Sequence, residues 1–154
     1  MTLDDHEREI LHLLQGDGRL SHAALARRVR LSPTAVAVRV KRLEDAGVIQ
    51  RYVAVVDPSR IGLPITAMVT MTCDGEQCRQ LPARVSPLTE VTACHRLTGD
   101  ASAILTVVVA SIPALERLVD RLAAFGKPST AVVLSTSFMA RPLPTGAPSG
   151  ASRA

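Results

Sequence analysis

Hydrophobic residues recur at helical spacing through the first third of the chain, and turn-forming residues interrupt them. Gly16-Asp17-Gly18 ends a first predicted helix, and Ser21 is a favoured N-cap for a second. Ser32-Pro33 predicts a third, since proline is tolerated in a first helical turn. The positions expected to face the core of this unit are Ile10, Leu11, Leu14, Leu25, Val29, Val36, Val40 and Leu43. Three helices with a tight turn before the third predict a helix-turn-helix over residues 1–50.

After Gly47 the hydrophobic pattern changes from helical spacing to the alternation of strands. Residues 48–56 are apolar enough for a strand, so 51–63 are predicted to be a linker strand and hinge. Further strands are expected at 65–73, 91–98, 104–110 and 131–140, and helices at 76–85 and from 112 to Gly126. The order β-α-β-β-α-β predicts a ferredoxin-like domain over residues 64–141, and the fold class is therefore α+β. The Pro-, Gly-, Ser- and Ala-rich residues 142–154 are expected to be a disordered tail.

Composition and charge narrow the function. Hydrophobic residues make up 47% of the 154 residues, which is enough for a packed core, and aromatic residues make up 2%. So few aromatic residues argue against binding single strands by base stacking. The net charge is +4, and the basic residues cluster on the second and third predicted helices with no acidic residue among them. These basic residues are Arg27, Arg28, Arg30, Arg39, Lys41 and Arg42.

The third helix carries the side chains suited to reading double-stranded DNA. A recognition helix contacts base edges chiefly through its N-terminal residues. Thr34 and Val38 are short enough for this role, and Arg39 fits a bidentate contact with guanine. The phosphate-positioning candidates are Arg27, Arg28, Lys41 and Arg42, with the N–H groups beside Ser32. The alternative is a merely solvated basic face, but the trihelical context favours DNA.

Several stretches together resemble the leucine-responsive regulator/asparagine regulator family of feast-or-famine transcription factors. They are SPTAVAVRVKRLEDAGVI, the Gly62-Leu63-Pro64 boundary, EVTACHRLTGD and the closing VVLSTSF. The resemblance implies a winged helix-turn-helix joined to a ferredoxin-like domain that forms homodimers, which often assemble into octamers. It also implies an amino-acid effector bound between dimers near the LTGD turn. No cofactor is expected.

That turn departs from the family pattern. Relatives usually continue Gly-Asp-Tyr-Asp, whereas this chain has Gly99-Asp100-Ala101-Ser102. An amino acid needs an anion for its ammonium and donors for its carboxylate. Asp100 fits the first role. The donors would come from N–H groups around Gly99 and Ser102, together with Ser135, Thr136 or Ser137. The alternative is that the glycine and aspartate only shape the turn.

The remaining cysteine and histidine side chains fit structural roles better than metal or redox chemistry. Cys94-His95 invites a metal site, but adjacent strand residues point to opposite faces, with His95 expected on the face of Val91, so no metal is predicted. Three cysteines and a charged N-terminus without a secretory pattern predict reduced thiols, no membrane span and a cytoplasmic location. The favoured function is therefore a sequence-specific DNA-binding regulator that is not an enzyme. Two alternative functions remain. One is a sirohaem decarboxylase-like enzyme on the same scaffold; the other is an effector-independent, nucleoid-associated DNA-binding protein.

Overall fold

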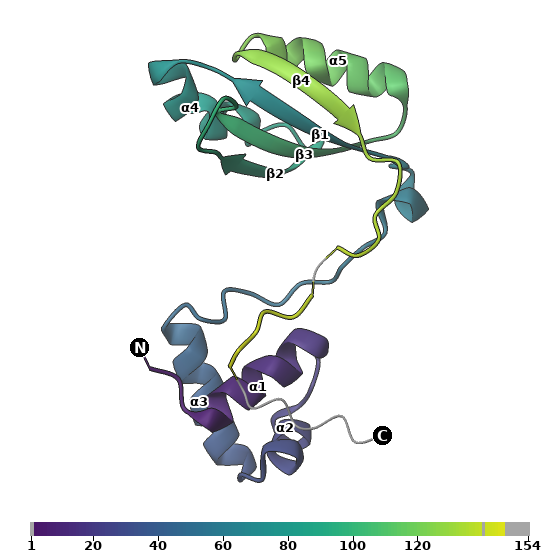
Figure 1. The fold of residues 1–154 in the computed structure, drawn as a ribbon. Helices are drawn as coiled ribbons and strands as arrows, with labels where there is room; N and C mark the ends of the chain where they lie inside the picture. Colours follow the sequence, from purple (N-terminus) through teal and green to yellow (C-terminus); the bar gives the residue numbers. More distant parts are fainter. Residues whose placement is uncertain (1, 140, 147–154) are drawn as a thin grey trace. The chain divides into compact units, whose positions relative to one another are not determined.

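The structure is a computed structural model that describes residues 2–139 and 141–146. The chain divides into two compact units, which Figure 1 draws as a helical group and a sheet with two helices. The first unit contains the described residues up to Val55 together with those from Phe138 onward, and the second contains Val56–Ser137. This division supports two separate hydrophobic cores, and each unit is described by itself below.

The first unit is a bundle of three short helices, as the hydrophobic spacing predicts. They are α1 (Asp5–Gly16), α2 (His22–Val29) and α3 (Pro33–Asp45). The Ser21 and Ser32 hydroxyls accept hydrogen bonds from the backbone N–H groups of Ala24 and Ala35, which caps α2 and α3 as expected. The fully or almost fully buried core residues are Ile10, Leu25, Ala26, Val29, Val36, Val40 and Leu43.

The turn between α2 and α3 depends on one residue in an unusual conformation. Arg30 has φ of 55° and ψ of 44°, in the left-handed region, and it is the only non-glycine residue with positive φ among those described. The next N–H, of Leu31, donates to the carbonyl of Ala26 at 3.1 Å. The chain thus reverses within two residues, and this reversal fixes how α3 is presented.

The strand expected at 48–56 does not form, and that prediction is wrong for this chain. The N–H groups of Val48 and Ile49 both donate to the carbonyl of Leu43, which closes the end of α3 instead. Residues 51–57 have no regular secondary structure, and a 3₁₀ turn follows at Pro58–Ile61. A strand requires a neighbour for its backbone groups, and this segment pairs with no described strand.

The second unit is a four-stranded antiparallel sheet with two helices, in the predicted β-α-β-β-α-β order. Its elements are β1 (Ile65–Thr72), α4 (Gly75–Val85), β2 (Val91–Arg96), β3 (Ala103–Val109), α5 (Ile112–Ala123) and β4 (Lys127–Val132). The sheet order is β2-β3-β1-β4, and both helices cover one face (Figure 1). Alternate residues of β1 and β3 are buried against α4 and α5, and this packing confirms the ferredoxin-like fold.

The last strand begins earlier than the sequence pattern suggested. The prediction was 131–140, but β4 starts at Lys127, which pairs with Thr72 of β1. Gly126 explains the early start. A Cβ built on this glycine would lie 2.7 Å from the carbonyl oxygen of Thr72, so only glycine lets the chain approach β1 this closely and begin pairing at once.

Part of the expected disordered tail makes defined contacts within the first unit. The side-chain amide of Gln15 donates to the carbonyl of Leu143 at 3.2 Å and accepts from the N–H of Leu143 at 2.6 Å. Arg8 donates to the carbonyl of Thr145 at 2.6 Å. The remaining residues of the expected tail, 147–154, lie outside the described residues. Every described helix is too short or too polar to cross a lipid bilayer.

Candidate nucleic-acid interface

One face of α3 is open to solvent and carries three of the predicted DNA-contacting residues. Thr34, Val38 and Lys41 follow at helical spacing and are all exposed. Val38 is 64% exposed, so its apolar side chain is accessible to a partner surface. Lys41 lies 3.2 Å from Asp45 one turn further on, an exposed ion pair that holds the lysine only weakly.

The opposite edge of α3 is tied to α1 by acidic residues. Asp4 and Glu7 form a capping box at the start of α1, and the Glu7 carboxylate is completely buried. The Nε of Arg42 donates to Glu7 at 2.7 Å, and this hydrogen bond is the main reason the pKa of Arg42 is raised. The structure thus gives Arg42 a structural partner in addition to any phosphate.

Arg39 is less available for a base contact than the sequence suggested. Its side chain is only 29% exposed, its Nε lies 3.6 Å from an oxygen of Asp4, and Nη1 is 3.5 Å from the carbonyl of Ala35. Asp4 and Glu7 were not identified beforehand as partners of the basic face. The capping-box spacing of aspartate and glutamate was visible in the sequence, but the proximity of α3 was not.

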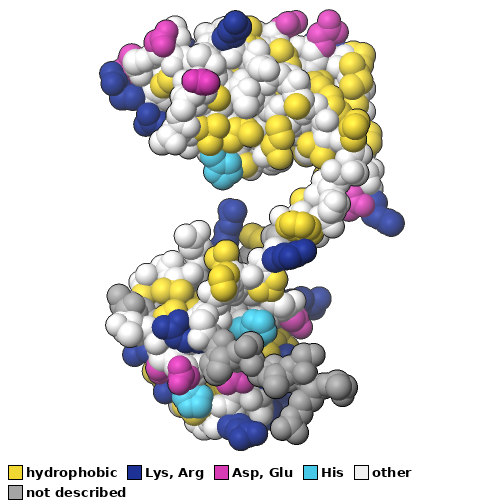
Figure 2. All heavy atoms as spheres, in the orientation of Figure 1, with side chains coloured by type: hydrophobic (Ala, Val, Ile, Leu, Met, Phe, Trp, Pro, Cys, Tyr) yellow, Lys and Arg dark blue, Asp and Glu magenta, His cyan; other side chains and the backbone are white. Residues whose placement is uncertain are grey.

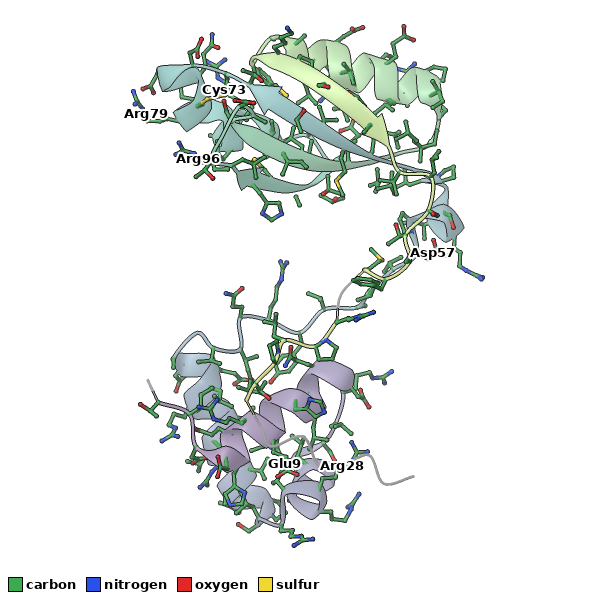
Figure 3. All side chains as sticks on the ribbon, in the orientation of Figure 1. Glu9, Arg28, Asp57, Cys73, Arg79 and Arg96 are labelled. Carbon is green, nitrogen blue, oxygen red and sulfur yellow. A yellow bond between two sulfur atoms is a disulfide. The ribbon has the colours of Figure 1, made fainter. Side chains whose placement is uncertain are left out.

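Further cations flank the open face on α2 and on the turn after it. Arg27 and Arg28 lie in the last turn of α2, Arg30 forms the turn, and all three are exposed (Arg28 is labelled in Figure 3). Within the described residues, none of the three side chains takes part in an ion pair or a side-chain hydrogen bond. Three unpaired cations beside the exposed Ser32 cap suit the binding of phosphate groups. The sequence places Arg30 in the basic run but does not identify it as a DNA contact.

Tyr52 contacts the C-terminal end of α3. Its hydroxyl donates to a carboxylate oxygen of Glu44 at 3.0 Å. Partial burial, followed by the hydrogen bond and the negative charge of Glu44, raises the pKa of Tyr52 to about 12. The two residues also line a small cavity of about 200 Å³ with residues of α1, α2 and α3. The segment after α3 is therefore attached to the bundle at Tyr52.

The predicted effector residues fall into two groups that do not meet within one chain. Gly99, with φ of 112°, Asp100 and Ser102 form the β2–β3 turn beside the end of β1, where the N–H of Ser102 donates to the carbonyl of Met71. Residues 135–137 follow β4 beside the beginning of β1, since the N–H of Val133 donates to Thr66. Five residue-to-residue steps along β1, from Thr66 to Met71, separate these points, roughly 17 Å at 3.3 Å per residue. One chain therefore does not bring Ser135, Thr136 and Ser137 to the turn.

The cysteines differ from the prediction of three reduced thiols. Cys73 and Cys78 form a disulfide, with Cα atoms 5.3 Å apart, and Cys94 is the free cysteine. A strand end and a helix start bring the two together, which spacing along the chain did not reveal. Burial raises the pKa of the Cys94 thiol.

The prediction that His95 lies on the same face of β2 as Val91 is wrong. An irregularity between Val91 and Ala93 shifts the register, so Val91 and Cys94 both pack against the core while His95 is exposed. His95 therefore does not share the face of Val91. The described residues contain no group of three or more His, Cys, Asp or Glu side chains that could hold a metal ion.

The helical unit and the sheet unit each match a known protein family. Residues 3–50 match the winged helix-turn-helix DNA-binding family, and residues 66–143 match the Lrp/AsnC ligand binding domain. The chain is 41% identical over 122 residues to the HTH-type transcriptional regulator LrpA of Mycobacterium tuberculosis, covering 79% of this chain and 81% of that protein.

Solved structures agree over both units. A feast or famine regulatory protein from M. tuberculosis, complexed with L-methionine, has a TM-score of 0.87 at 37% identity, covering 91% of this chain and 97% of that one. A transcriptional regulator from Neisseria meningitidis in complex with L-Met has a TM-score of 0.85 at 30% identity, covering 93% and 97%.

A capped helix-turn-helix followed by a ferredoxin-like ligand-binding domain defines a DNA-binding transcriptional regulator. The matches of both domains, and of relatives that contain both, identify the family within this class. The chain belongs to the Lrp/AsnC family of transcriptional regulators.

Proposed function

We propose that this regulator reads its DNA sites through the open face of α3, with Thr34 and Val38 against base edges and Lys41 on a phosphate. The observation that carries the proposal is the exposed Val38 between two polar residues on a helix that buries Val36, Val40 and Leu43. A valine in the major groove meets the methyl group of thymine, which accounts for its exposure in the free protein.

The remaining predicted residues take supporting roles in this arrangement. Arg27 and Arg28 would bind phosphates beside the capped start of α3 at Ser32. Arg42, which is half exposed, would contact a phosphate while keeping its ion pair with Glu7. Arg39 contacts guanine only if it leaves Asp4, so its contribution to base preference is expected to be small.

A second copy of the chain is the partner that we propose for the sheet. No helix of the second unit covers the face opposite α4 and α5, where the outward residues of β1 and β3 are apolar or threonine. Hydrophobic side chains reach the surface of this unit in Figure 2. A homodimer would hide this face and carry two reading heads to major grooves about 34 Å apart, which requires a pseudo-palindromic site. Assembly of four dimers into an octamer extends the same proposal.

The effector we propose is an amino acid bound at the β2–β3 turn. The support is the exposed carboxylate of Asp100 beside Gly99, together with the ligand-binding-domain match and the two relatives solved with methionine. Ser135, Thr136 and Ser137 would join this site only from another copy of the chain. We propose that a regulator of this kind acts where the chromosome lies, in the cytoplasm.

The test of the DNA interface is a titration of site-containing and random duplexes at several salt concentrations. Lys41→Ala should weaken binding to both duplexes and reduce the slope of log K against log salt by about one, because one phosphate contact is lost. Val38→Ala should leave the slope unchanged and lower the preference for the specific site. Lys127→Ala, which removes an exposed lysine of β4, is the matched control and should match the wild type. Equal slopes for all three variants would contradict the proposal.

A further inference from the structure

The region around Cys73 connects three parts of the second unit. Cys73 directly follows β1 and is almost fully buried, and Cys78 lies in the first part of α4 and is half-buried (Cys73 is labelled in Figure 3). Their Cα separation of 5.3 Å is well within the range that a disulfide requires. Asp74, the N-cap of α4, makes no side-chain capping bond, and the disulfide is the covalent link between the end of β1 and the start of α4.

The same residue is bonded to the predicted effector turn through Ser102. The Ser102 hydroxyl accepts from the N–H of Cys73 at 3.1 Å and donates to the carbonyl of Cys73 at 3.0 Å. The carbonyl of Ser102 accepts from the N–H of Leu97, which closes the turn. A change in the position of Cys73 is therefore transmitted to the turn that contains Gly99 and Asp100.

The side of Cys73 that faces the α5–β4 connection leaves no room for such a change. A Cβ on Gly126 would lie 3.0 Å from the Cys73 Cβ, so the connection between α5 and β4 is packed directly on this residue. Because this side of Cys73 is closely packed, we expect a movement of Cys73 to be taken up by α4 and by the Ser102 turn.

We propose that Cys73 and Cys78 are a reversible thiol–disulfide site through which small disulfides control the β2–β3 turn. Formation of the disulfide is independent of the proposed function; only its consequence for effector binding rests on it. In a reducing compartment both thiols are free, and the disulfide is the oxidised state.

With a small disulfide RSSR as oxidant, the step is two successive exchanges. The more exposed Cys78 thiolate attacks one sulfur of RSSR, the S–S bond breaks, and RS⁻ leaves as RSH after taking a proton. The Cys73 thiolate then attacks the Sγ of Cys78 and expels the second RS⁻. The two cysteines are oxidised by two electrons, and RSSR is reduced to two RSH. A dithiol reverses both steps.

The test uses the full chain, treated with dithiothreitol or with oxidised glutathione. Titratable thiols in the denatured protein should fall from three to one on oxidation, since Cys94 remains free. Mass spectrometry should find the peptides of Cys73 and Cys78 linked. Backbone amides of residues 97–102 should exchange more slowly with deuterium in the oxidised protein. Cys78→Ala should keep two thiols under both treatments, and Cys94→Ser should go from two to none.

The Ser102→Ala variant separates formation of the disulfide from the effect of the disulfide on the β2–β3 turn. This variant should still lose two thiols, but exchange in the turn should no longer respond to oxidation. Retention of three thiols in the wild type, linkage through Cys94, or turn exchange that is the same in both states would overturn the proposal. L-methionine affinity and DNA binding of the reduced wild type, measured alongside, test the proposed function separately, because neither enters the thiol count.

Discussion

The conformation of Arg30 gives a sharp test of how the helix-turn-helix is built. A residue with a Cβ at φ of 55° experiences steric strain that glycine does not. Replacing Arg30 with either glycine or alanine removes the same charge, and only the alanine variant keeps the Cβ. The difference in stability between Arg30→Gly and Arg30→Ala therefore isolates the backbone conformation from the electrostatics.

The expected difference follows from two opposing contributions. The left-handed conformation costs an alanine about 1–2 kcal/mol. Glycine has greater freedom in the unfolded chain and loses roughly 0.5–1 kcal/mol of stability for that reason. The glycine variant should thus be more stable than the alanine variant by about 0.5–1 kcal/mol, which for a unit of this size is an increase of a few degrees in melting temperature. In an ordinary helical conformation the order would be reversed.

Urea unfolding followed by tyrosine fluorescence measures this difference. The chain has one tyrosine and no tryptophan, and Tyr52 is hydrogen-bonded to Glu44 of α3, so the signal reports on the helical unit. Arg28, exposed within α2, is the matched control position, where alanine should exceed glycine by about 1 kcal/mol. If alanine is also the more stable residue at position 30, the left-handed turn is absent and the presentation of α3 described above is wrong.

Two further predictions use the same chain. Absorbance titration should show Tyr52 ionising near pH 12, and Glu44→Gln should lower the pKa of Tyr52. The raised pKa means that the folded state favours the neutral phenol. The resulting stabilisation of the folded state is complete below pH 10 and is lost as the pH rises toward about 12. A midpoint at pH 10 would show that Tyr52 is not held by the bundle. Gly126→Ala should destabilise the second unit by about 1–3 kcal/mol in thermal unfolding, because its Cβ would lie 2.7 Å from the Thr72 carbonyl at a positive φ. Gly16→Ala, with open space around it, should be neutral or stabilising by up to about 1 kcal/mol, and equal losses at both glycines would contradict the close approach.

The elements that the sequence located well are those specified by local chemistry. Ser21 and Ser32 begin helices because their hydroxyls reach N–H groups three residues ahead, a bond that requires no distant partner. The alternation in β1 identified its buried face, because a strand packed on one side must place apolar residues at every second position. Local rules of this kind were enough to predict both units and the basic helix.

The sequence predictions that proved wrong concern segments whose structure depends on residues distant in the sequence. The apolar stretch after Gly47 has strand composition, but a strand also needs a neighbour, and within the described residues this segment has none. The irregularity in β2 moved Cys94 to the core face because the register of β3 determines which residues oppose it. No pattern within either segment contains that information.

By itself, the sequence determined the three helices with the Ser21 and Ser32 caps, the order of strands and helices, and the cationic surface of α2 and α3, since propensity, spacing and charge are properties of neighbouring residues. Only the tertiary structure decided which cations remain available. It tied Arg42 to the buried Glu7 and Arg39 to Asp4 and left Lys41 and Val38 exposed, because pairing and burial depend on which helices pack together. In the same way, folding of β1 and α4 joined Cys73 to Cys78 and placed Ser102 against them, as contacts between elements are fixed by packing.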